Sequence, residues 1–177
     1  MNINQRNDLA PPKLFLDSAL IIATLCSSNP DASPGYGLFK LGEAGLIHLY
    51  TSEDVLRETQ GVLTELLGEA ADKVKLLLAE NLAMANISVT LPPSDSTISE
   101  CYGITQYRPD AKILAAAIEQ NCEVFVTYDR EHLLKNPKIG PPNTRLVVMT
   151  GGEAEAWAID QIGVRSRLKA AQKRSRE

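Results

Sequence analysis

The chain has 177 residues, of which 44% are hydrophobic, which is enough for one globular domain with a core and short for two. No apolar run approaches the length of a membrane span, and the polar residues 1–12 lack the basic and apolar regions of a signal peptide, so we expect a cytoplasmic protein with a flexible N-terminus. The formal net charge is −4, and the three cysteines form no CxxC pair, which argues against a disulfide framework and a zinc site.

Short apolar runs alternate with stretches of helical periodicity along the rest of the chain. Five strands are expected, at residues 13–17, 46–51, 86–91, 124–127 and 145–150. Helices are expected at residues 18–26, 36–45, 52–85 with a break near Gly68, 110–121, and from about Glu153 onward. Residues 92–109 are expected to form a polar loop.

The expected strands are continuous apolar runs separated by helices. This pattern predicts an α/β fold in which a mostly parallel sheet is covered on both faces, a three-layer sandwich. We assign the domain to residues 13–160. The last segment, residues 161–177, carries six basic residues and one acidic residue, and is expected to be a basic tail that either contacts phosphates or forms a solvated helix.

Four acidic residues occupy positions at or near one edge of this sheet. Asp17 and Asp129 follow the first and fourth strands, where the carboxyl ends of parallel strands bind ligands. Asp110 opens the helix that leads into the fourth strand, and Glu58 lies on the flank of the apolar face of the helix after the second strand. Each has an alternative interpretation, because the three aspartates are good helix caps and Glu58 alone is a boundary charge.

Together the four acids favour a metal site. Carboxylates gathered in one cleft repel one another unless a cation neutralises them. A set of oxygen donors indicates Mg²⁺ or Mn²⁺, ions that serve phosphoryl transfer by activating water and stabilising charge on the leaving oxygen. The sequence has neither the G-x-S-x-G motif of hydrolases nor the G-x-G-x-x-G motif of dinucleotide-binding proteins.

Three stretches, "LFLDSALI", "LIHLYTSEDVLRETQGVL" and "RPDAKILAAAIEQNCEVFVTYDREHLL", resemble PIN domains, the metal-dependent ribonuclease fold of many bacterial toxins and RNA-processing nucleases. The resemblance covers about residues 13–150 and lies in the order and spacing of the acids. It implies a PIN-like fold, and it implies that the metal ligands and catalytic residues are Asp17, Glu58, Asp110 and Asp129.

The resemblance also assigns neighbouring residues. Thr127 is the small hydroxyl residue expected before the last acid, and Glu131 is a candidate auxiliary acid. Two positions depart from the family pattern. Ala19 stands where Asn is usual, which removes a hydrogen-bonding group near the first acid, and Tyr128 stands where Gly is common.

The function that the resemblance implies is cleavage of single-stranded RNA by a Mg²⁺- or Mn²⁺-dependent endoribonuclease, in the manner of the toxin of a toxin–antitoxin pair with a cognate antitoxin as partner. Arg108, Lys112 and Arg130 are the candidate RNA contacts. The alternative is a PIN-like nucleic-acid-binding or scaffold protein in which catalysis is weak or absent. The apolar helical residues 62–83 form a homodimer face or pack on the sheet.

Overall fold

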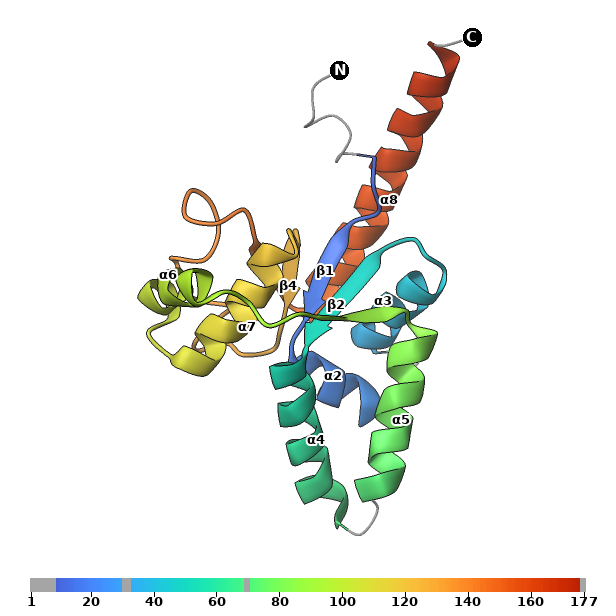
Figure 1. Ribbon diagram of the computed structural model, residues 1–177. Coiled ribbons are helices and arrows are strands. Elements are labelled where there is room, and N and C mark those ends of the chain that lie inside the picture. Colours follow the sequence, from blue (N-terminus) through green and yellow to red (C-terminus); the bar gives the residue numbers. More distant parts are fainter. Residues whose placement is uncertain (1–8, 30–32, 69–70, 176–177) are drawn as a thin grey trace.

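The computed structural model describes residues 9–29, 33–68 and 71–175, and most of the expected flexible segment 1–12 lies outside them. A five-stranded, fully parallel sheet forms the centre, in the order β3-β2-β1-β4-β5 (Figure 1). The strands are β1 (Lys13–Leu16), β2 (His48–Ser52), β3 (Ile87–Thr90), β4 (Val124–Val126) and β5 (Val147–Met149). All five expected strands are therefore present.

Seven helices are present in the described part of the chain, and they cover both faces of the sheet. They are α2 (Ser18–Leu25), α3 (Pro34–Glu43), α4 (Glu53–Leu67), α5 (Ala71–Met84), α6 (Asp95–Thr105), α7 (Arg108–Glu119) and α8 (Gly151–Arg174). Helix α2 packs on α4 and α3 packs on α8, whereas α6 packs on α7 as a separate pair (Figure 1). The fully parallel sheet with helices on both faces confirms the expected α/β sandwich.

The prediction of a polar loop at residues 92–109 is wrong, because most of this segment forms α6. The Ser94 side chain caps this helix by accepting a hydrogen bond from the Thr97 amide at 3.4 Å, and it also donates to Glu119 of α7 at 2.7 Å. The helix has a weak apolar period and follows two prolines, so composition alone indicates a loop. Its cap and its packing on α7 stabilise it instead.

The two central strands bring the ends of β1 and β4 together. Phe15 and Phe125 are paired across the two strands, fully buried, and their rings stack with centroids 5.4 Å apart. The ladder continues one step past β1, because the Asp17 amide donates to the Val126 carbonyl at 3.0 Å. The first residues after each strand are therefore neighbours at the carboxyl edge of the sheet.

Helix α8 runs along the sheet from the carboxyl edge to the amino edge. Thr150 and Glu153 form a capping box at its start, next to the end of β5. The helix continues without a break through residue 160, and the buried Arg165 donates to Glu123 at 2.5 Å and to the Ala10 carbonyl. Because Glu123 directly precedes β4, the part of α8 beyond Arg165 lies at the amino edge of the sheet, opposite the carboxyl ends of β1 and β4 (Figure 1).

The domain boundaries expected from the sequence stay a prediction. None of the helices in residues 9–29, 33–68 and 71–175 has the length and apolar character that crossing a membrane requires.

Candidate metal centre

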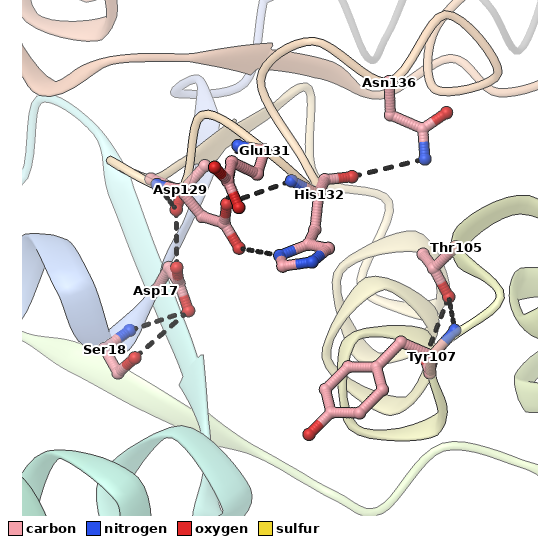
Figure 2. A network of polar contacts seen from close by, with 9 residues as sticks. Asp17, Ser18, Thr105, Tyr107, Asp129, Glu131, His132 and Asn136 are labelled. Carbon is pink, nitrogen blue, oxygen red and sulfur yellow. Dashed lines mark hydrogen bonds and ion pairs between the residues drawn. The ribbon is translucent and has the colours of Figure 1, made fainter.

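The floor of the site is a buried aspartate held by hydrogen bonds from two residues. Asp17 caps α2, and its Oδ1 accepts a hydrogen bond from the Ser18 amide at 2.8 Å, as the capping interpretation expects (Figure 2). Its Oδ2 accepts from the Thr127 hydroxyl at 2.5 Å. The same hydroxyl accepts from the Asp129 amide at 3.0 Å, so Thr127 connects the first and last acids of the predicted set.

The carboxyl group of Asp17 is difficult to ionise in this position. Its residue is 5% exposed, and this burial raises its pKa from 3.8 to about 6. The hydrogen bonds from Thr127 and Ser18 act in the opposite direction and favour the charged form, whereas the nearby charges of Glu58 and Asp110 raise the pKa further. A cation beside Asp17 would remove this penalty.

The rim of the site is a turn in which Asp129 accepts three hydrogen bonds. Its Oδ1 accepts from the amides of Glu131 at 2.9 Å and His132 at 3.0 Å, and its Oδ2 lies 3.1 Å from Nδ1 of the His132 ring (Figure 2). Burial alone would raise the pKa of Asp129, but the hydrogen bonds and charge of His132 and the Glu131 amide outweigh it, so the pKa is lowered. The hydrogen bond to Asp129 is also the main reason that the pKa of His132 is raised.

Asp110 supplies a carboxylate oxygen that lacks a protein partner. Helix α7 begins at Arg108 with Tyr107 as its cap residue, so Asp110 lies in the first turn and does not cap the helix. Within the described chain, its buried Oδ2 has no hydrogen bond. Burial and then the charge of Asp129 raise the pKa of Asp110. Ligand atoms of Asp110, Asp129 and His132 all lie within 4.8 Å of one another, which is close enough to hold one ion.

Glu58 stands beside this cluster on the wall of an open cleft of about 520 Å³. It is exposed on α4, and its charge raises the pKa of both Asp17 and Asp110, so it lies near both carboxyl groups. Two of the expected RNA contacts, Arg108 and Lys112, line the same cleft. The structure thus brings the four predicted acids and two predicted basic residues to one edge of the sheet.

Three other sequence-predicted residues do not enter the cluster through their side chains. Glu131 contributes its backbone amide to Asp129, while its side chain is exposed, and Arg130 is exposed outside the lining of the cleft. The Tyr128 hydroxyl packs closely on Gly151 at the start of α8. A Cβ atom at position 151 would lie only 2.5 Å from the hydroxyl oxygen, so the contact requires glycine there. Burial raises the pKa of this phenol.

Two residues near the acids, His132 and Tyr107, are absent from the site residues predicted from the sequence, whose metal ligands were all carboxylates. His132 has a signal in the sequence, since it stands three residues after a strand-end aspartate, within the reach of one turn. Tyr107 has none, because its position depends on the junction between α6 and α7, where the sequence predicts a loop.

Comparisons with known proteins bear on the family of the chain. Among solved structures, VapBC2 from Rickettsia felis bound to a DNA fragment from their promoter shares the fold with a TM-score of 0.54 at 16% identity, covering 78% of this chain and 98% of the other. VapC20 from Mycobacterium tuberculosis, described as a Sarcin-Ricin loop cleaving toxin, gives a TM-score of 0.45 at 13% identity, covering 67% and 92%. The comparison with curated proteins gives no match. A model of the PIN domain matches residues 13–131, more than half of the chain, which therefore belongs to the PIN domain family.

Proposed function

We propose that the protein is a metal-dependent endoribonuclease that hydrolyses phosphodiester bonds of single-stranded RNA at the acidic edge of its sheet. The observation that carries this proposal is the unpartnered Oδ2 of Asp110 beside Asp129 and His132. A buried carboxylate oxygen without a donor is unfavourable unless a cation faces it. Carboxylates with an imidazole suit Mn²⁺, and carboxylates alone suit Mg²⁺, so the residues present fit either ion.

The side chains divide the work of such a site. Asp110 and Asp129 would hold the ion, with Asp17 and Glu58 as the remaining ligands and His132 as an additional donor or as the group that orients Asp129. When bound, the ion would lower the pKa of an attacking water and stabilise charge on the leaving oxygen.

The groups around these ligands prepare the site for RNA. The Thr127 hydroxyl donates to the Asp17 carboxylate and accepts from the backbone amide of Asp129, so it holds both residues in place. Arg108 and Lys112 offset the negative charge of the cleft, so that a phosphate can approach it.

A role as the toxin of a cytoplasmic toxin–antitoxin pair belongs to the same proposal. The fold likeness to the VapBC2 structure supports it, and a cognate antitoxin is the partner that it implies. A homodimer is a further part of the proposal. It is consistent with exposed leucines on α4 and α5, among them Leu66 (63% exposed) and Leu76 (61%).

The test is cleavage of a labelled single-stranded RNA with Mn²⁺, Mg²⁺ or EDTA, comparing the wild type with Asp110→Asn. The matched control is Asp95→Asn, since Asp95 is also an acid in the first turn of a helix but lies outside the cleft. We expect metal-dependent cleavage that Asp110→Asn reduces at least about 100-fold and Asp95→Asn leaves unchanged, because only Asp110 is placed to touch the ion.

Isothermal titration with Mn²⁺ separates the two functions that the sequence left open. If the wild type binds Mn²⁺, Asp110→Asn does not, and neither cleaves RNA, the protein is a binding or scaffold protein rather than a nuclease. The departure from the family pattern at Ala19 would then be the first position to change in a search for lost activity. Cleavage that EDTA leaves intact would contradict the proposed site altogether.

A further inference from the structure

Tyr107 is an exposed aromatic residue directly beside the proposed metal cluster. Its side chain lines the cleft, and the residue is 55% exposed. Its ring stacks on that of His132, with centroids 6.4 Å apart and an interplanar angle of 29°. In Figure 2 the His132 ring lies between Asp129 and Tyr107. Many large apolar side chains of this chain are exposed, and Tyr107 differs from them in lining the cleft and stacking on a residue of the proposed metal cluster.

The backbone holds Tyr107 firmly in this exposed position. The Thr105 hydroxyl donates to the Tyr107 carbonyl at 3.0 Å and accepts from its amide at 3.4 Å (Figure 2). The Tyr107 carbonyl also accepts from the Ala111 amide at 3.0 Å, in the first turn of α7. Gln106 lies between α6 and α7 with a φ of +58°, a left-handed backbone conformation that residues other than Gly rarely adopt. The ring is therefore presented by a fixed turn, which lowers the entropy lost when a ligand binds.

Two basic residues of α7 line the same cleft as Tyr107. Arg108 follows Tyr107 directly, Lys112 lies one turn further along α7, and both line the cleft. Neither forms an ion pair within the part of the chain that the structure describes, whereas Arg57 on the opposite wall is paired with Asp54 at 3.0 Å. An open aromatic face with unpaired cations beside it matches the base and phosphate of one nucleotide.

We propose that Tyr107 is the base-binding subsite of the protein, on which a base of single-stranded RNA stacks next to the phosphate that is cleaved, with Arg108 and Lys112 binding the adjoining phosphates. This inference rests on the proposed nuclease function and names how that site takes its substrate. Stacking on a tyrosine requires no particular base, because every base has a π-face. The subsite thus positions a strand without reading its sequence.

The test uses short single-stranded RNAs that carry the fluorescent base 2-aminopurine at one position in turn, with Ca²⁺ in place of Mg²⁺ to pair the carboxylates. Wild type is compared with Tyr107→Phe, Tyr107→Leu and Tyr107→Ala. The matched control is Tyr102→Ala, since Tyr102 is 51% exposed on the neighbouring α6 but does not line the cleft. Thermal unfolding of each variant verifies that it is folded.

We expect quenching of 2-aminopurine at one or two positions by the wild type and by Tyr107→Phe, and its loss in Tyr107→Leu and Tyr107→Ala. Tyr107→Ala should weaken RNA binding about ten-fold, as removal of one base–aromatic stack does. Removing the base at the quenched position should weaken binding by the wild type similarly, without a further loss in Tyr107→Ala. The fluorescence of 2-aminopurine in single-stranded DNA of the same sequence should be quenched in the same way, because the base and not the sugar stacks on Tyr107.

Two outcomes would overturn the subsite, and they differ in what they say of the nuclease. Equal binding and equal quenching by wild type and Tyr107→Ala would show that Tyr107 only supports His132, while metal-dependent cleavage by the same preparations keeps the nuclease function. Absence of both RNA binding and cleavage in the wild type would overturn the subsite and the nuclease together.

Discussion

The floor and the rim of the acidic edge contain the same kind of side chain, with pKa values shifted in opposite directions. On the floor, burial raises the pKa of Asp17 to about 6 even though Ser18 and Thr127 donate hydrogen bonds to the carboxylate. On the rim, Asp129 accepts three hydrogen bonds in a half-exposed turn, and its pKa is lowered. One hydroxyl, that of Thr127, contacts both residues. Burial outweighs the hydrogen bonds at Asp17, whereas the hydrogen bonds outweigh burial at Asp129, so the floor is the part whose charge a cation would stabilise most.

The largest effect on stability is expected from Asp17→Asn in metal-free protein. Between pH 3.8 and about 6 the folded protein retains a proton on Asp17 that the unfolded chain has lost, so the free energy of unfolding falls as the pH rises through this window. Asn carries no charge and avoids this cost of ionisation, so Asp17→Asn should raise the free energy of unfolding at pH 7 by about 3 kcal/mol, the value of a pKa shift of this size. Urea unfolding in EDTA from pH 4 to pH 8 measures it.

The corresponding change on the rim, Asp129→Asn, should have the opposite sign. Because the pKa of Asp129 is lowered, its charged form stabilises the fold above its unfolded pKa, and this stability is lost as the pH falls through the folded pKa. We therefore expect Asp129→Asn to lower the free energy of unfolding at pH 7. A loss of stability in both variants would contradict the contrast between floor and rim.

A smaller effect is expected from Thr127→Val, which removes the link between floor and rim without changing the shape of the side chain. The variant leaves Oδ2 of Asp17 and the Asp129 amide without their shared partner, at a cost of about 1–3 kcal/mol in the free energy of unfolding. The control is Thr59→Val, since the buried hydroxyl of Thr59 has no hydrogen bond to the described residues. That variant should be neutral or more stable, and equal losses in the two valine variants would show that the link contributes nothing.

The smallest effect on stability is expected from His132→Ala, because the imidazole is 58% exposed and its pair with Asp129 is open to solvent. Mn²⁺ affinity should respond instead, by about ten-fold, since His132 orients or joins the ligands of the ion. Isothermal titration measures this change, and urea unfolding verifies that the midpoint stays the same. A large loss of stability with unchanged Mn²⁺ affinity would assign His132 to the fold rather than to the site.

Much of the fold could be predicted because its signals are local. The five strands are apolar runs between helices, and Gly68 separates α4 from α5 as expected. Helix α6 could not be predicted, because its stability comes from the Ser94 cap and from packing on α7 rather than from an apolar period. Composition describes a segment by itself, whereas this helix depends on its neighbour.

The site could be predicted as a group of acids but not as a geometry. Strand ends identify Asp17 and Asp129, because parallel order brings those ends to one edge. The spacing puts His132 within reach of Asp129, but which atoms meet depends on the geometry of the turn, and the place of Tyr107 depends on the left-handed Gln106 that precedes it. The opposite pKa shifts of the two aspartates follow from burial at Asp17 and from hydrogen bonds at Asp129, neither of which the sequence alone gives.

The hydrogen bonds of Thr127 also limit the chemistry that this residue can perform. A hydroxyl group has one proton, and that of Thr127 is directed to Asp17, while a lone pair receives the Asp129 amide. Attack by this oxygen on a phosphorus atom would require it to leave both partners and to emerge from a position with 0% exposure. A hydrogen bond to a carboxylate could by itself activate a hydroxyl, so it is the burial of Thr127 that argues against a nucleophilic role and against a phosphothreonine intermediate at this edge of the sheet.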